Sequence, residues 1–416
     1  MTSRHSAVAI ALMASLYAAP ALAQVPGMGA GTPIGESGPD ESKVRVRLGP
    51  LLLGPTVSLT NLGIDQNVFN EPTDQNPKKD FTFTVQPATE LWLRLGPTWV
   101  TGKIQEDLVW FKTYASERTA NNVSSVGWYV PLNRLAMTFG ATHRNVRDRP
   151  GFEIDARSQR SETEYTGRIE VRALTRTFIA AGASRQKIDF DKDAVFLNSN
   201  LQFELSRVTT SAGLALRYQV TPLTSVSLAA NRSEDRFAFS SLRDSDSTAA
   251  SVSIAFDPAA LIKGSATFGY RDFQPLAPAL PNFRGTTASV DLFYTLLGTT
   301  RFGVTAIRDL QYSYDVNQPY YLLTGFTASI AQQLFGPLDV VGRAGAQHLA
   351  YRERAGVVIP LSNRVDSVRS YGGGIGYRLS RDLRLGFDVD HANRVSDVSQ
   401  RQYDDLRFGL SVTYVF

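Results

Sequence analysis

Apolar and polar side chains alternate through most of this chain, in segments of roughly ten or more residues separated by turn residues. In an extended strand, successive side chains point to opposite faces. The last segment would therefore carry an uninterrupted apolar stripe on one face: Phe408, Leu410, Val412, Tyr414 and Phe416. The alternation recurs at 134–142, 168–173, 251–257 and 383–390. A soluble sheet can also alternate, but repetition along the whole chain favours a membrane-spanning barrel.

Short and long connections also alternate. Short turns are expected near 96–97, 131–133, 175, 221–222, 258–260, 298, 336–337 and 380–381. Longer polar stretches lie near 68–79, 115–120, 147–158, 191–200, 239–247, 274–283, 315–319, 353–364 and 395–400. This order is typical of periplasmic turns and extracellular loops. The chain is predicted to be all-β, a transmembrane antiparallel up-and-down β-barrel of about 18 strands, with 16 as the alternative. The alternation of apolar and polar side chains is irregular in 55–67, 98–114 and 299–314. In the last of these segments, Arg308 falls on the apolar face.

The ends of the chain predict export and insertion. Residues 1–23 have a short polar start with Arg4, an apolar stretch and the cleavage pattern Ala21-Leu22-Ala23, as in a signal peptide. Residues 24–53 are expected to form a flexible periplasmic segment, and residues 54–416 the barrel in the outer membrane of a Gram-negative cell. Tyr414 and Phe416 are the predicted membrane-insertion signal. Through this last strand we expect contact with outer-membrane lipid and the barrel-assembly machinery.

Composition removes several function classes. The formal charge is +4, falling to +3 once Arg4 is removed with the signal, which is too balanced to indicate nucleic acid. The chain has no Cys, so disulfides and thiolate metal sites are excluded. Only eight of the 43 basic residues are Lys. Arg suits carboxylate and phosphate contacts, although codon bias would explain the excess equally well.

Few residues could perform catalysis. The expected mature chain has only His143, His348 and His391, which the alternation places on the lipid face near the outer ends of strands. Amphipathic rings at a membrane boundary explain them better than catalysis. No phosphate loop, metal-ligand pattern or cofactor motif is present, so the sequence predicts no enzyme, no metal site and no cofactor.

Charges that alternate with the apolar stripe would face the barrel interior. Those expected to set selectivity are Arg134, Arg168, Arg172, Arg217, Arg271, Arg343, Arg378, Arg384, Arg407, Asp388 and Asp390. The carboxylates Asp388 and Asp390 share a face with Arg384 and are best explained by a charge ladder inside the barrel. Basic residues outnumber acidic ones, which predicts a positive lumen that favours anions. The Pro-rich stretch 274–281 is either a constriction or an exposed loop.

Two motifs near the start of the barrel carry a family resemblance. Leu48-Gly49-Pro50-Leu51-Leu52-Leu53-Gly54-Pro55, followed by Gly63-Ile64-Asp65-Gln66-Asn67-Val68-Phe69, resembles the putative β-barrel porin group often found with exopolysaccharide gene clusters. Together with the last strand, the resemblance covers roughly residues 44–416. It implies an outer-membrane barrel that assists polymer export, with no catalytic residues to transfer.

Three functions remain as hypotheses. The first is a porin-like channel for small anionic solutes or oligosaccharides. The second is an accessory component of exopolysaccharide secretion, which contacts periplasmic polysaccharide-export proteins through residues 24–50. The third, a barrel lipase or protease, is disfavoured by the placement of the histidines.

Overall fold

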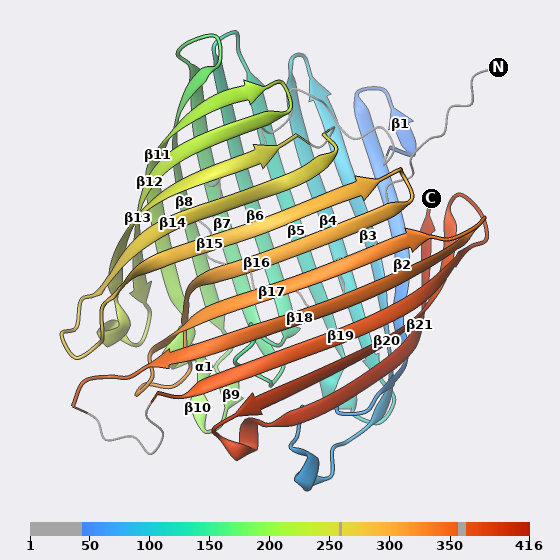
Figure 1. Cartoon of the computed structure of the whole chain (residues 1–416), viewed down its shortest axis with the longest axis vertical. Coiled ribbons are helices and arrows are strands. Elements are labelled where there is room, and N and C mark those ends of the chain that lie inside the picture. The colour runs from blue at the N-terminus through green and yellow to red at the C-terminus, as the bar shows by residue number, and fades with distance from the viewer. Residues whose placement is uncertain (1–43, 258–259, 357–362) are drawn as a thin grey trace.

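A closed antiparallel β-barrel forms the molecule in the computed structural model, which describes residues 44–257, 260–356 and 363–416 (Figure 1). Its main sheet contains 19 strands, of which the short β1 (Val46–Leu48) pairs only with β2, so 18 form the barrel. These are β2 (Leu51–Asp65), β3 (Asp80–Leu95), β4 (Thr98–Phe111), β5 (Thr119–Pro131), β6 (Leu135–Asp148), β7 (Ser158–Arg172), β8 (Thr177–Phe190), β11 (Arg207–Thr221), β12 (Thr224–Phe237), β13 (Ser245–Phe256), β14 (Ile262–Pro275), β15 (Phe283–Leu296), β16 (Thr300–Tyr312), β17 (Tyr320–Gln333), β18 (Leu338–Arg352), β19 (Val365–Arg378), β20 (Leu383–Ser396) and β21 (Tyr403–Val415).

Pairing between the first and last barrel strands closes the ring. β2 and β21 are antiparallel, with register from Thr56 opposite Val415 to Asp65 opposite Arg407. Each remaining strand pairs with its neighbours in the chain. The prediction of an up-and-down barrel of 18 strands is therefore confirmed, and 16 is excluded.

The two ends of the barrel differ (Figure 1). Short turns join the strands at the end where β21 finishes, and the longer connections lie at the other end. The predicted alternation is confirmed, although residues 258–259 and 357–362 lie outside the described chain. By the usual asymmetry of such barrels, the first end is periplasmic and the second extracellular. The extracellular connections contain β9 (Val195–Phe196), β10 (Ser199–Asn200), α1 (Leu201–Leu205) and the 3₁₀ turns η1 (Thr73–Gln75), η2 (Ala115–Glu117), η3 (Ser241–Arg243) and η4 (Ser399–Arg401).

The start of the barrel differs from the expected residue 54. β2 begins at Leu51, and β1 folds back on it through Gly49, which has a φ of 61°. The run Leu51-Leu52-Leu53 has no apolar–polar alternation, so the pattern could not show that it is already a strand. The expected signal peptide 1–23, and the segment before residue 44, lie outside the described residues.

Two of the segments with irregular alternation have a structural cause. In β2 the register shifts around Asn61, whose φ is 54°, so the strand bulges and the faces exchange. In β16, Arg308 does lie on the outward face, where its guanidinium donates to the Thr286 carbonyl oxygen at 3.3 Å and to Thr324 Oγ1 at 3.0 Å. The β15–β16 ladder ends at the pair Ala288–Arg308, so this side chain bonds a carbonyl just beyond that pair.

The outward face is apolar and ends in aromatic rings. Phe408, Leu410, Tyr414 and Phe416 are exposed as predicted, and the rings of Tyr414 and Phe416 pack edge to face with centroids 4.7 Å apart. Such aromatic girdles mark membrane boundaries in barrels. No helix in the described residues is long and apolar enough to span a bilayer.

Candidate functional site: the barrel lumen

The lumen-facing charges form ion pairs, which the sequence did not predict for most of them. Arg168 lies 2.9 Å from Glu170, and Arg217 also bonds Glu170. The Arg217 guanidinium stacks over the Phe178 ring, 3.9 Å from its centroid. Glu170 is therefore shared between two arginines from β7 and β11, across β8, and it neutralises part of the charge expected there.

A second set of pairs crosses β19. Arg343 on β18 lies 3.1 Å from Asp388 and 2.9 Å from Asp390, both on β20. Asp339 bonds Arg384 between the same two strands. The predicted charge ladder is thus present, but it includes Arg343 and Asp339 from a strand two positions away.

Glycines explain why these side chains can cross a strand. Gly372, Gly374 and Gly376 share the lumen face of β19, directly between β18 and β20. A Cβ atom at these positions would collide with Asp390, Asp388 and Arg384 respectively. The lumen face of β19 therefore has no side chains at these three positions, and the ion pairs lie directly over its backbone. We call these three glycines the floor of β19. Glycine at alternate positions of one strand was the sequence signal for this arrangement.

The remaining predicted residues occupy both ends of the lumen. Arg271 lies 3.1 Å from Asp309, and Arg407 lies 2.8 Å from Asp405 and 3.2 Å from Asp65. Arg172 and Arg378 lie at the periplasmic ends of β7 and β19. Arg134 does not face the lumen from a strand, because β6 begins only at Leu135 and Arg134 belongs to the turn. The positive field of the lumen stays a prediction, since inside the lumen Glu170, Asp388 and Asp390 pair with arginines.

The middle of the lumen is accessible to water. The side chains of Arg343 and Asp388 are 21% and 29% exposed, although both face the interior. A side chain packed in a solid core would be far less accessible. The barrel therefore encloses a wet, charged passage over this part of its length.

One extracellular segment crosses the barrel interior. Residues 149–157 connect β6 and β7, yet Phe152 packs against Tyr321, Leu323, Leu349 and Tyr351. Those four side chains belong to β17 and β18, half-way round the ring from β6 and β7. We call residues 149–157 the crossing segment.

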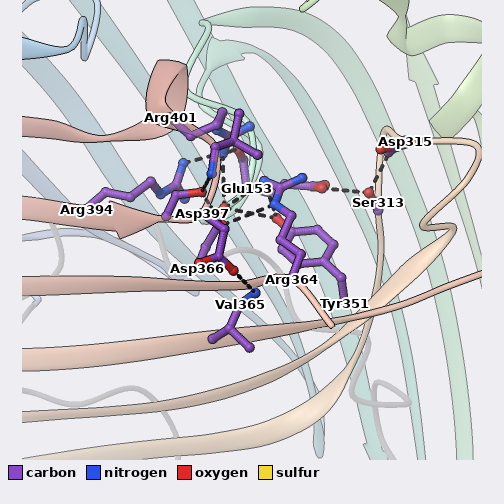
Figure 2. A network of polar contacts seen from close by, with 12 residues as sticks. Glu153, Ser313, Asp315, Tyr351, Arg364, Val365, Asp366, Arg394, Asp397 and Arg401 are labelled. Atoms are coloured by element: carbon purple, nitrogen blue, oxygen red, sulfur yellow. Dashed lines mark hydrogen bonds and ion pairs between the residues drawn. The ribbon is translucent and has the colours of Figure 1, made fainter. Parts of the chain in front are cut away.

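A polar network fixes the tip of the crossing segment (Figure 2). The Ser313 hydroxyl donates to Glu153 Oε1 at 2.6 Å, and the Tyr314 backbone N–H donates to Oε2 at 3.2 Å. Asp155 accepts from Arg394 at 2.7 Å and lies 3.3 Å from Arg401. Both arginine side chains are essentially inaccessible, with exposures of 0% and 1%. Removing one member of such a buried ion pair strongly destabilises the folded state, so these contacts hold the segment in place.

Apolar packing adds to this attachment. Ile154 belongs to a buried cluster that also contains Phe190, Phe196, Leu201 and Tyr314, so the connection with β9, β10 and α1 joins the same interior cluster. Two connections therefore enter the extracellular half of the lumen and pack together there.

The environment alters ionisation in the crossing segment. Burial raises the pKa of Glu153, although the Ser313 hydroxyl and Arg401 act in the opposite direction. Burial, and then repulsion by Arg149, lowers the pKa of Arg157 to about 10, so this side chain remains charged near neutral pH. Arg157 lies 3.2 Å from Glu117, and it also donates to the Val68 carbonyl oxygen at 3.1 Å.

The Pro-rich loop does not occupy this position. Ala279 accepts a backbone hydrogen bond from Ala355, and Pro281 accepts one from the Tyr320 hydroxyl, each at 2.9 Å. Leu276 remains exposed. The loop is thus bonded to neighbouring extracellular connections. Sequence reasoning located a loop at 147–158 but had no signal that it turns inward.

The histidines lie on the outward face, as expected. His143 contacts Thr163 at 3.0 Å, His348 contacts Ser367 at 3.2 Å, and His391 contacts Asp404 at 3.0 Å. All three are exposed. Within the described residues, no group of three or more His, Asp or Glu side chains could hold a metal ion.

Fold and lumen together define the class: a porin-like outer-membrane β-barrel channel. The chain belongs to the family described as putative beta-barrel porin 2, whose model matches residues 43–416. This confirms the family inferred from the two N-terminal motifs.

Several solved structures are similar to this chain at low sequence identity. A BenF-like porin from Pseudomonas fluorescens Pf-5 is 12% identical with a TM-score of 0.50, over 88% of this chain and 98% of that one. Pseudomonas aeruginosa OccK9 (OpdG) is 13% identical with a TM-score of 0.47, again over 88% and 98%. OccK2 (OpdF) of the same organism, solved with glucuronate, is 11% identical with a TM-score of 0.48, over 88% and 98%. At these identities the likeness concerns the fold alone. No curated protein matches the sequence.

Proposed function

We propose that this barrel passes small anionic solutes, including acidic oligosaccharides, and that the crossing segment restricts the extracellular half of the passage. The observation that carries the proposal is the set of arginines on the lumen face at different depths of the barrel, among them Arg407, Arg343 and Arg378. Arginine binds carboxylate and phosphate oxygens in a planar, bidentate geometry. Rings of basic side chains favour anions in a pore.

Reversal potential under a salt gradient tests the selectivity. The refolded barrel is inserted in a planar bilayer with unequal KCl on the two sides, and the sign of the potential gives the preferred ion. Anion preference supports the proposal. Cation preference would sink it, because the paired acids would then dominate the lumen field.

Polymer secretion is a second candidate, favoured by the basic side chains at the periplasmic ends of strands, among them Arg94, Arg172 and Arg378. In this role the periplasmic segment that precedes residue 44 would contact polysaccharide-export proteins. Deleting residues 24–43 should then abolish polymer export while the barrel still inserts. Unchanged export from the deletion strain would remove this candidate.

Assembly depends on the last strand in either role. We propose that the barrel-assembly machinery recognises β21 through Tyr414 and Phe416, both exposed on the outward face. The cleaved signal peptide remains a prediction for residues 1–23.

A further inference from the structure

Two arginines lie on the outward, lipid-facing surface of the barrel. Arg308 is on β16 and Arg369 is on β19, and both are in the extracellular halves of their strands. A charge on the lipid face of a barrel is destabilising at the middle of the bilayer and costs little near the head groups. The two arginines therefore mark the level at which the apolar band meets the outer-leaflet head groups.

Polar side chains connect the two arginines across β16 to β19, which lie side by side in the wall (Figure 1). Arg308 lies directly opposite Thr324 on β17, which lies opposite His348 on β18. His348 in turn lies opposite Ser367, and Arg369 follows on the same face of β19. Arg308 donates to Thr324 Oγ1 at 3.0 Å, and His348 Nδ1 lies 3.2 Å from Ser367 Oγ. We call these five side chains the outer polar cluster.

The acids of the same four strands lie on the other side of the wall. Within the described residues, β16 to β19 contain only Asp309, Asp339 and Asp366. All three face the interior, where each is paired with an arginine. The outward faces of these strands therefore carry no acidic side chain in the part of the chain that the structure describes.

Acids near the edges of the outer polar cluster already have partners. On the flanking strands, the outward Asp272 lies 3.1 Å from Arg284, and the outward Asp404 lies 3.0 Å from His391. Asp404 is two strands away from Arg369. In the adjoining extracellular connections, the acids that accept a backbone N–H are Asp315, Glu353 and Asp397.

The arginines retain donors for an anion. The Arg308 guanidinium is fixed by two bonds, to the Thr286 carbonyl oxygen at 3.3 Å and to Thr324 Oγ1. A guanidinium has five N–H donors, so three remain. Arginine binds phosphate oxygens in a bidentate geometry, and the Thr324 and Ser367 hydroxyls can donate beside it. The cluster therefore fits phosphate.

The distance between the arginines indicates the kind of phosphate ligand. β16 and β19 are three strand spacings apart, which places the Cα atoms of Arg308 and Arg369 roughly 15 Å apart. A lipid with a single phosphate can contact only one of them. A lipid with a phosphate at each end of a disaccharide can contact both, and it gains affinity from the second contact.

Apolar side chains cover the outward face on the periplasmic side of the cluster. Phe326 on β17 and Tyr371 on β19 are 49% and 53% exposed. On β18, Ala346 lies opposite Phe326 and Ala344 lies opposite Tyr371. Acyl chains that descend from a head group held at the cluster would lie against this surface.

We propose that the outer polar cluster binds the two phosphates of a phosphorylated disaccharide lipid of the outer leaflet, of the lipid A type, with its acyl chains on Phe326, Ala344, Ala346 and Tyr371. The site faces the membrane and not the lumen. This inference is therefore independent of what the barrel transports.

Native mass spectrometry of the refolded barrel in detergent tests the proposal. The probes are diphosphoryl lipid A, its monophosphoryl form and phosphatidylglycerol. We expect one bound diphosphoryl lipid A, with a Kd about tenfold lower than that of either other lipid. Equal affinities would overturn the proposal. A dimer of this chain in place of the lipid complex would assign the face to a second copy and would overturn it too.

Matched variants locate the lipid on the barrel. Arg308→Gln combined with Arg369→Gln should raise the Kd for diphosphoryl lipid A about tenfold, since each exposed ion contact contributes modestly. Arg185→Gln combined with Arg232→Gln removes two outward arginines from β8 and β12 and should leave the Kd unchanged. An equal effect of the two pairs would contradict the proposal.

Arg369→Gln alone keeps the test decisive if the double variant does not fold. Arg369 is exposed and has no ion pair within the described residues, so its replacement should leave the wall intact. The single variant should bind diphosphoryl lipid A about threefold more weakly than the natural protein. Unaltered lipid binding by the folded variant would overturn the proposal.

Discussion

Individual glycines decide how the lumen charges pair. Gly372 lies between Arg343 and Asp390, while Gly373 beside it has only the Val341 carbonyl oxygen within contact distance. The two glycines are adjacent on the same strand, but Gly372 faces the lumen and Gly373 faces outward. Substitutions at the two positions therefore distinguish a steric clash on the lumen face from the general effect of replacing a strand glycine.

Gly372→Val should lower the free energy of unfolding, and Gly373→Val should not. The added side chain at residue 372 would collide with the Asp390 carboxylate and displace its ion pair with Arg343. Overpacking of this kind costs about 1–3 kcal/mol. Urea titration of both variants in detergent measures the difference. Equal destabilisation would show that the floor of β19 has no special role.

We expect the docking of the crossing segment to depend on pH through Glu153. Its folded pKa is raised by burial, so its contribution to docking is complete below the unfolded value and is lost as pH rises through the raised value. Ser313 and the Tyr314 backbone N–H donate to its carboxylate, and the charges of Arg243, Arg364 and Arg401 also act on it. Arg394 and Arg401 donate to its backbone carbonyl oxygen.

Glu153→Gln should therefore remove part of this pH dependence, because the amide stays neutral and can still accept from Ser313. The measurement is the dwell time of closed states in single-channel records between pH 5 and 8. We expect longer openings toward high pH in the natural protein and a flatter profile in the variant. Identical profiles would show that Glu153 does not control closure.

At the scale of single elements, the sequence predicted the strands well and the crossing segment poorly. Alternation specifies strands such as β20 and β21 because each face has its own solvent, lipid or water. The crossing segment contains Phe152, Glu153 and Ile154, a mixture of apolar and charged residues that is typical of an ordinary loop. Its position inside the barrel depends on contacts with residues far away in the sequence, such as those of β17 and β18. Bulges such as that at Asn61 are equally invisible, since one extra residue merely exchanges the faces.

Deleting Phe416 should reduce the amount of assembled barrel. Its ring packs on Tyr414 at the end of β21 and contributes to the aromatic girdle. The matched control is Phe408→Leu, which keeps an apolar side chain on the same outward face. Heat-modifiable mobility of outer-membrane fractions measures the folded amount. Equal amounts of folded barrel in the deletion and the control would contradict a role for the terminal ring.

At the scale of the whole molecule, the middle of the barrel carries water-accessible charges, and two connections enter its extracellular half. The sequence predicted a barrel, its orientation and a majority of basic lumen residues. It could not predict that the middle charges pair across strands, because those pairs join residues 45 or more positions apart. The proposed transport depends on the lumen-facing arginines and on the connections that enter the extracellular half of the barrel.

Single-channel conductance, with and without the crossing segment, tests this account most directly. The variant replaces residues 150–156 with a Gly-Ser linker of equal length, and a matched control replaces residues 276–280 in the Pro-rich loop. We predict small, stable openings for the natural protein, a conductance several-fold higher for the first variant and no change for the control. Equal conductance in the natural protein and the first variant would contradict the claim that residues 149–157 restrict the passage.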